Sequence, residues 1–254
     1  MKIIKKLKWV LTWMAMAMLK RSLRYLISGE NTFWLQNVRD NDISIFNRID
    51  FILDQCIDKR ILHIGFSDHP FTLEKISNGS LLHLQIQQIA KSILGLDIEK
   101  NTIRQYREIT KDENVVYGDI TLQYPLEATD FQPEIILLSE VLEHLEEPYK
   151  AIEVLYKSFP GGTKVLVTVP NYTSLDCLAA SFNKTESIHP LHHWYFSPYT
   201  LRRLFDDKRF ELEQLHFGMY YQPKSSINMV LKNYPFNGDC IIALVTIIKN
   251  NKHV

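Results

Sequence analysis

Short apolar runs bounded by turn residues recur along the chain from residue 60 onward. Such runs are typical of strands that are buried on both faces of a sheet. Five of them span residues 60–65, 92–97, 114–117, 133–138 and 163–169. Helical patterns lie between them at 81–91, 99–108 and 148–158. Because strands that alternate with helices form crossover connections, the pattern predicts a parallel sheet.

Two further strand-like runs, at 211–217 and 240–248, lie near the end of the chain. They predict an antiparallel terminal hairpin whose strands are joined by the long segment 218–239. With the five earlier runs they predict an α/β fold with a Rossmann-like, mostly parallel seven-stranded sheet and helices on both faces. The sequence has no internal repeat and no low-complexity linker. We therefore expect one domain over residues 31–254, preceded by an arm over residues 1–30.

The first 25 residues differ from the rest because they hold seven basic residues and no acidic residue. The apolar run Trp9–Leu19 is shorter than the roughly 20 residues that a membrane-spanning helix needs,. Lys20 and Arg21 follow the run, which argues against a cleaved secretory signal,. One face of the expected helix carries an apolar stripe made of Ile3, Leu7, Val10, Met14 and Met18.

This pattern predicts that the arm, over residues 1–25, is a helix that lies on a membrane surface. A helix that packs on the domain is the alternative. The whole chain holds three cysteines and no CxxC pair, so neither a zinc cluster nor a disulfide framework is indicated,. We expect a cytoplasmic protein, peripheral at the inner face of the membrane if the arm docks there.

The net charge of the chain excludes one class of partner and indicates no other. Lys and Arg together number 29, and Asp and Glu together also number 29. The main domain therefore lacks the basic excess that is typical of nucleic-acid binding, and we expect no nucleic-acid partner.

Residues suited to a nucleotide ligand stand where the first three strands end. Ligands of open parallel sheets bind outside the carboxyl ends of the strands. Gly65 would let the backbone approach a ligand, and Asp97 could accept hydrogen bonds from two ribose hydroxyls,. Asp119 could accept one from an adenine amino group. The alternative for each aspartate is a helix cap.

The segment Ser139–Asn171 reads SEVLEHLEEPYKAIEVLYKSFPGGTKVLVTVPN. It resembles class I S-adenosylmethionine (SAM)-dependent methyltransferases, whose fourth strand is followed by an EVLEHL-like stretch, a helix, a PGG turn and a strand ending in VPN. The stretch His193–Phe205 is similar to another motif of that family. The stretch His63–Pro70, with Leu82 and His83, is similar to a bacterial subgroup associated with surface glycan biosynthesis. The resemblance covers roughly residues 59–248.

The resemblance implies SAM as the cofactor and methyl transfer to a hydroxyl of a small molecule or glycan, which would be lipid-linked if the arm docks. A nicotinamide-dependent enzyme is disfavoured because no GxGxxG follows the first strand,. The residues predicted to contact the cofactor stand at the strand ends: His63, Gly65, Phe66, Ser67, Asp97, Ile98, Asp119, Ile120, Ser139 and Glu140.

The first loop departs from the family pattern D/E-x-G-x-G-x-G. The corresponding residues are His63, Gly65, Ser67 and His69, so the acid and two glycines are absent. A non-catalytic SAM-fold binding protein, docked at a membrane, is therefore the alternative function.

His144 follows the fourth strand, beside the expected position of the methyl group, and we take it as the candidate catalytic base,. Two other interpretations stay open, although no metal site is assigned. His144 would be a metal ligand if Glu140 and Glu143 form an E-x-x-E-H site with it, completed by His189, His192 or His193. Glu143 and His144 would instead be structural if they cap and orient the following helix.

Overall fold

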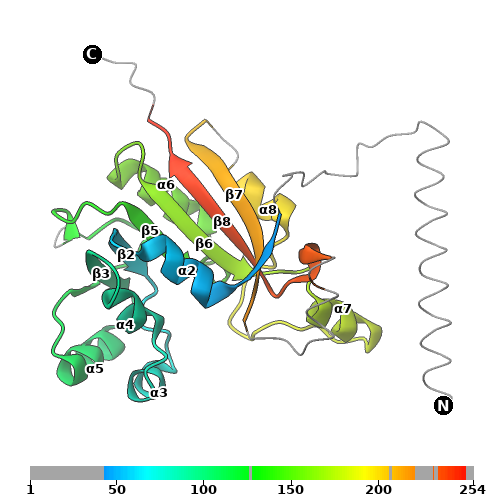
Figure 1. The fold of residues 1–254 in the computed structure, drawn as a ribbon, viewed down its shortest axis with the longest axis horizontal. Coiled ribbons are helices and arrows are strands. Elements are labelled where there is room, and N and C mark those ends of the chain that lie inside the picture. Colours follow the sequence, from blue (N-terminus) through cyan, green and yellow to red (C-terminus); the bar gives the residue numbers. More distant parts are fainter. Residues whose placement is uncertain (1–42, 126–127, 206–207, 221–230, 232–233, 250–254) are drawn as a thin grey trace. The chain divides into compact units, whose positions relative to one another are not determined.

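All seven predicted strands form, and they lie side by side in one sheet (Figure 1). Their bounds are Arg60–Ile64 (β2), Ser92–Asp97 (β3), Val115–Tyr117 (β4), Ile135–Ser139 (β5), Lys164–Pro170 (β6), Phe210–Met219 (β7) and Cys240–Ile247 (β8). β2 to β6 pair in parallel, whereas β8 runs antiparallel to both β6 and β7. The predicted fold class, including the terminal hairpin, is confirmed.

The computed structural model describes residues 43–125, 128–205, 208–220, 231 and 234–249, all within the compact unit Asp40–Val254. The predicted arm, residues 1–30, lies outside the described residues. Within the described residues, no helix is both long enough and apolar enough to span a membrane.

The predicted count of seven strands is one too low. An additional strand, Ile45–Asn47 (β1), pairs in parallel with β7 at the edge of the sheet. The order within the described residues is β1-β7-β8-β6-β5-β2-β3-β4. None of the residues of β1 is buried, and β1 leads directly into a helix, so no apolar run bounded by turn residues marks this strand. Turn residues do bound β4, which is equally short,.

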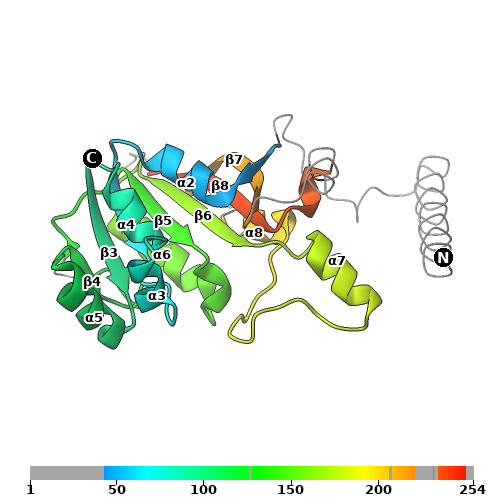
Figure 2. The ribbon, with the colours of Figure 1, turned by 60° about the horizontal axis from the view of Figure 1, so that its bottom comes forward.

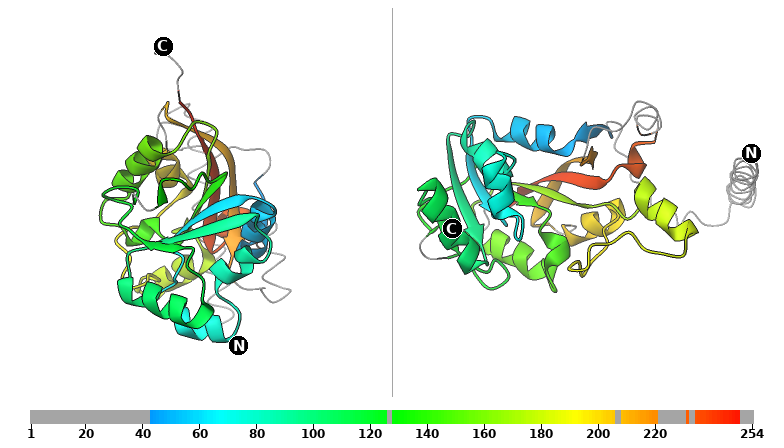
Figure 3. Two further views of the ribbon diagram at one scale, coloured as in Figure 1. Left: turned by 90° about the vertical axis from the view of Figure 1, so that its left-hand side faces the viewer. Right: turned by 90° about the horizontal axis from the view of Figure 1, so that it is seen from below.

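Helices cover both faces of the sheet, with α2 and α4 on one face and α6 and α8 on the other (Figures 1 and 3). Their bounds are Arg48–Cys56 (α2), Thr72–Ser77 (α3), Leu82–Gln87 (α4), Lys100–Thr110 (α5), Pro148–Ser158 (α6), Leu175–Phe182 (α7) and Pro198–Leu204 (α8). Figure 2 shows α7 beyond the end of β6, and none of its residues is buried. α4 is shorter than its predicted range of 81–91.

α2 starts at a strong cap, which is the last residue of β1. The Asn47 side chain accepts hydrogen bonds from the backbone N–H groups of Ile49 and Asp50, at 3.0 and 3.1 Å. Such a cap satisfies donors that the first helical turn leaves without partners. The short connection holds Arg48 at the first position of α2, close to the carboxyl ends of the central strands.

The largest described core lies between α2, α4 and the centre of the sheet. Its members include Ile52, Ile61, Ile86, Leu137 and Leu166, none of which is exposed. Burying such a side chain contributes about 1.5–3 kcal/mol. The central strands thereby form a rigid platform for the loops at their carboxyl ends.

The backbone turns sharply at Gly65, directly after β2. Its φ of +73° is a conformation that residues with a Cβ rarely adopt, and an added Cβ would lie 2.6 Å from Val141 Cγ2,. Gly79 has the same φ, but nothing lies within 4 Å of its Cβ position. The two glycines therefore separate the cost of the backbone conformation from that of the steric contact.

We predict that Gly65→Ala lowers the free energy of unfolding by roughly 1–3 kcal/mol more than Gly79→Ala does. Both variants bear the same conformational cost, whereas only the first one forces β-branched Val141 to move. Urea denaturation of both variants measures the difference. Equal losses would show that Val141 yields without cost and that the loop is not sterically fixed.

Candidate active site

A cavity of about 980 Å³ opens at the carboxyl ends of β2, β3 and β5. The chain order reverses between β2 and β5, so the cavity lies at the topological switch point where open α/β sheets bind ligands,. Most of the predicted site residues line it: His63, Gly65, Phe66, Ser67, Asp97, Ile98, Ser139, Glu140 and His144. The structure thus gathers residues that are up to 81 positions apart in the sequence.

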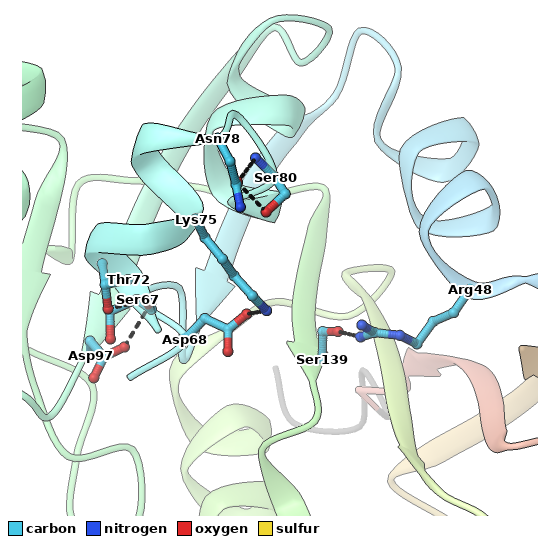
Figure 4. Close-up of polar contacts among 9 residues, drawn as sticks. All are labelled: Arg48, Ser67, Asp68, Thr72, Lys75, Asn78, Ser80, Asp97 and Ser139. Carbon is cyan, nitrogen blue, oxygen red and sulfur yellow. Dashed lines mark hydrogen bonds and ion pairs between the residues drawn. The ribbon is translucent and has the colours of Figure 1, made fainter. Parts of the chain in front are cut away.

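The Asp97 carboxylate joins the loops after β2 and β3 (Figure 4). Its Oδ2 accepts a hydrogen bond from the Ser67 backbone N–H at 3.0 Å, and its Oδ1 accepts one from the Glu99 N–H, also at 3.0 Å. Asp97 is only 8% exposed. Each carboxylate oxygen keeps a further lone pair, so the group can still accept hydrogen bonds from a ligand in the cavity.

The Ser67 side chain provides a second polar group in the cavity wall. Its hydroxyl is buried and has no hydrogen-bond partner in the described structure, whereas its carbonyl accepts from Thr72 Oγ1 at 2.5 Å. A buried hydroxyl without a partner is costly, and a polar ligand would remove that cost. The pairing of this orphaned hydroxyl with the Asp97 carboxylate fits a hydroxyl-rich ligand such as a nucleoside.

Asp119 and Ile120 do not line the cavity in the described structure. Asp119 Oδ1 accepts hydrogen bonds from the Thr121 backbone N–H and hydroxyl, at 2.8 and 2.6 Å. Ile120 is buried, with 4% of its surface exposed. Asp119 therefore stabilises its own turn here, and its contact with an adenine stays a prediction.

A network of polar side chains stands at the end of β5. Arg48 donates to Ser139 Oγ at 2.7 Å, and its guanidinium lies 5.3 Å from the centre of the Tyr220 ring. Glu140 accepts from Thr168 Oγ1 at 2.8 Å and from the Tyr220 hydroxyl at 2.6 Å. Burial, followed by the charge of Glu140, raises the pKa of Tyr220, so this hydroxyl stays a donor,.

Sequence reasoning missed Arg48 altogether. Arg48 precedes the first predicted strand, and only the unpredicted strand β1 and helix α2 carry it to the cavity. Among the described residues, Lys75 is the other lysine or arginine in the cavity wall, and it forms an ion pair with Asp68 (Figure 4). The cap residue Asn47 was the available signal for a helix that starts here.

A cluster of histidines lies beside Glu143 at another part of the cavity. The ring centres of His144 and His192 are 4.5 Å apart, and those of His189 and His192 are 5.1 Å apart. Burial lowers the pKa of His144, and burial with the neighbouring histidines lowers that of His192 to about 4. The rings of His144 and His192 are therefore neutral at pH 7 and can accept protons.

Glu143 is fully buried, and neither carboxylate oxygen has a hydrogen-bond partner in the described structure. Burial, followed by the charge of Glu140, raises the pKa of Glu143 well above its ordinary value. Glu143, His144 and His192 offer ligand atoms that all lie within 4.8 Å of one another, so these groups could hold a metal ion. Glu140 accepts hydrogen bonds from Thr168 and Tyr220 instead. The backbone N–H of His193 donates a hydrogen bond to the Glu143 carbonyl.

Known methyltransferases match this chain in sequence and in fold. A family model described as a methyltransferase domain matches residues 47–215. The mitochondrial ubiquinone biosynthesis O-methyltransferase of Dictyostelium discoideum is 25% identical over 152 residues, which cover 53% of this chain and 47% of that protein. The chain thus matches about half the length of this curated relative.

Two solved structures share the fold. The magnesium protoporphyrin IX methyltransferase of Synechocystis, which contains bound S-adenosylhomocysteine, matches 79% of this chain and 82% of its own at 12% identity and a TM-score of 0.51. A SAM-dependent methyltransferase from Aquifex aeolicus matches 80% of this chain and 90% of its own at 12% identity, also with a TM-score of 0.51.

The sheet order, the cavity at the switch point and the family match define a class I methyltransferase fold. The chain belongs to the methyltransferase domain family, and one of the solved structures that share its fold contains S-adenosylhomocysteine.

We predict that Asp97→Ala weakens SAM binding roughly ten- to a hundredfold, because charge-assisted hydrogen bonds contribute about 1.5–3 kcal/mol. Asp119→Ala tests the predicted adenine contact separately, because Asp119 does not line the cavity in the described structure. Isothermal titration calorimetry measures both affinities. An unchanged affinity in Asp97→Ala would contradict the ribose assignment, and a comparable loss in Asp119→Ala would place the adenine at that residue.

Proposed function

We propose that this methyltransferase transfers the methyl group of SAM to a hydroxyl of a small molecule or glycan, and that His144 is the general base. The observation that carries the proposal is the neutral His144 ring in the wall of the same cavity as Asp97. The name of the Dictyostelium relative, an O-methyltransferase, supports a hydroxyl acceptor.

Methyl transfer requires that the acceptor hydroxyl is aligned with the methyl group of SAM, and it also requires that this hydroxyl loses its proton. SAM supplies an electrophilic methyl group, and a sugar or phenolic hydroxyl attacks it while losing a proton. Asp97, Ser67 and Gly65 would hold the nucleoside end at the strand termini. His144 would accept the hydroxyl proton on a ring nitrogen, a step that is worth about 10²–10⁴ in rate.

Arg48 would bind the carboxylate of the methionine end. It lies in the cavity wall, forms no ion pair with a carboxylate in the described structure, and has a buried Nε without a partner. A guanidinium forms strong charge-assisted hydrogen bonds with a carboxylate. Under this assignment, β1 and α2 place the residue that binds the cofactor carboxylate at the cavity.

We predict that His144→Ala lowers turnover by about 10²–10⁴ without weakening SAM binding. His193→Ala is the matched control, because His193 is an exposed neighbour that does not line the cavity. Transfer of labelled methyl groups to a panel of sugars and phenols measures turnover. Equal turnover in both variants would contradict the role of His144 as the base. No turnover in the wild type at millimolar SAM would contradict the proposal and favour a non-catalytic binding protein.

The pH profile gives a second measurement on the same base. A base must be neutral to act, so activity rises with pH and levels off above the pKa of His144. Because burial lowers that pKa from its ordinary value of 6.5, the midpoint lies below pH 6.5. If a chelator abolishes wild-type activity and a divalent ion restores it, Glu143, His144 and His192 form a metal site instead.

We further propose that the arm, residues 1–25, docks the enzyme on an anionic membrane at the cytoplasmic face. Its seven basic residues and apolar stripe support this proposal. Each lysine near an anionic leaflet contributes about 1 kcal/mol, and salt screens this attraction. A lipid-linked acceptor would then share the plane of the enzyme.

We predict that the full chain floats with anionic vesicles at low salt, and that a chain starting at Glu30 does not. The attraction should weaken as salt is added, because the arm binds partly through charge. Flotation of both chains on phosphatidylglycerol vesicles decides the matter. Equal flotation of the two chains, or none of the full chain, would contradict membrane docking.

A further inference from the structure

Helix α7, which lies beyond the end of β6 (Figure 2), has an apolar side that the rest of the described chain does not bury. Leu175, Leu178 and Phe182 recur at helical spacing on that side, and none of the residues of α7 is buried,. Asp176 and Cys177 lie on the other side of the helix and line the cavity. The polar side of α7 therefore faces the cavity, and the apolar side does not.

Further exposed apolar side chains lie on the segments next to α7. Ile188 and Leu191 are exposed and at the same time line the cavity. Trp194 Nε1 donates to the Leu145 carbonyl at 2.8 Å, yet 45% of Trp194 is exposed. Large apolar side chains that gather at one opening mark an interaction surface. We call this set the apolar rim: Tyr172, Leu178, Phe182, Ile188, Leu191 and Trp194.

The residue types of the apolar rim suit the surface of a lipid bilayer. Leucine, isoleucine and phenylalanine enter the boundary of the acyl chains, whereas tryptophan and tyrosine favour the level of the headgroups. The acids between residues 172 and 194 are Asp176 and Glu186, and both line the cavity. Lys184, which is exposed two residues after the end of α7, is the cation of this segment. An anionic headgroup at the apolar side therefore meets a lysine, while the carboxylates belong to the cavity wall.

The described chain begins near the same surface. Ile45, in β1, lies against Gly238, because a Cβ added to this glycine would be 2.9 Å from Ile45 Cδ1. The Gly238 carbonyl accepts a hydrogen bond from Asn171 Nδ2 at 2.8 Å, and Asn171 stands four residues before α7. A chain of the length of residues 26–42 spans at most about 60 Å. An arm on a bilayer and an apolar rim on the same bilayer are thus compatible.

Two arguments favour a bilayer over a protein as the occupant of the apolar rim. A protein or a second copy of the chain on this surface would lie across the cavity entrance, because Ile188 and Leu191 belong to both. A bilayer instead contains amphiphilic acceptors. Stable attachment to a membrane generally takes two signals, and here the arm supplies charge while the apolar rim supplies apolar surface,.

We propose that the apolar rim sits on the bilayer that the arm binds, so that the cavity opens toward the lipid and receives an acceptor with an apolar chain. The inference rests on the proposed docking of the arm, and it adds the orientation of the domain and the class of acceptor. It does not depend on His144 as the base. The apolar rim is the weaker of the two signals, so a chain starting at Glu30 still does not float with vesicles.

Hydrogen–deuterium exchange of the full chain, with and without phosphatidylglycerol vesicles, locates the contact. We expect slower exchange on vesicles in peptides that cover α7 and residues 188–194, and no change in α5, which packs at the β4 edge of the sheet. Slower exchange in the arm alone would overturn the inference and leave the docking of the arm intact. No binding of the full chain would overturn both. Protection of α7 that rises with protein concentration in the absence of vesicles would assign the surface to a second copy and would also overturn the inference.

Two full-chain variants that are matched in exposure test the apolar contribution. Phe182→Ser removes a rim side chain that is 55% exposed, and Ile109→Ser removes one that is 54% exposed on α5. Flotation over a series of vesicle concentrations gives the partition coefficient of each variant. We expect Phe182→Ser to lower this coefficient roughly three- to tenfold, because the ring no longer leaves water, and Ile109→Ser to leave it unchanged. Equal partition coefficients of the two variants would overturn the inference.

Discussion

The site depends on one buried carboxylate that ties two loops together. Asp97 ends β3, and its two oxygens hold the backbone of Ser67, after β2, and of Glu99, at the start of the next helix. The Ser67 bond spans 30 residues and is buried. The first loop keeps only Gly65 of the family's usual glycines, so the hydrogen bond between Asp97 and Ser67 helps to fix the conformation of this loop. We propose that the group that organises the loop also binds the ribose of the cofactor.

Around this bond the sheet acts as a rigid support. Neighbouring strands β2, β3 and β5 are in register, so their carboxyl ends reach the cavity together. Apolar residues fill both faces of these strands and leave the polar groups at their ends. The polar groups occupy different parts of the cavity wall. The Asp97 carboxylate and the Ser67 hydroxyl lie near the ends of β3 and β2, and the histidines lie around Glu143.

Sequence patterns were sufficient for the strands that form apolar runs bounded by turn residues, including β4 with only three residues. They failed for β1, none of whose three residues is buried, and so for Arg48, whose position depends on that strand. They also overextended α4, where the backbone leaves the helix after Gln87. Asp97 and Asp119 look alike in the sequence, and only the tertiary structure separates the one in the cavity wall from the one that closes its own turn. The contact between His63 and His83 joins residues 20 positions apart, and no periodicity indicates it.

The central claim is that SAM binds at the ends of β2 and β3 although the first loop has lost most of its glycines. Hydrogen–deuterium exchange of the full chain, with and without S-adenosylhomocysteine, tests this most directly, since a bound ligand protects the backbone that it covers. The account predicts slower exchange in peptides that contain Gly65–Ser67 and Asp97–Glu99, and no change in 210–213, at the amino end of β7, which does not line the cavity. Unchanged exchange in both of those segments at saturating ligand would contradict it.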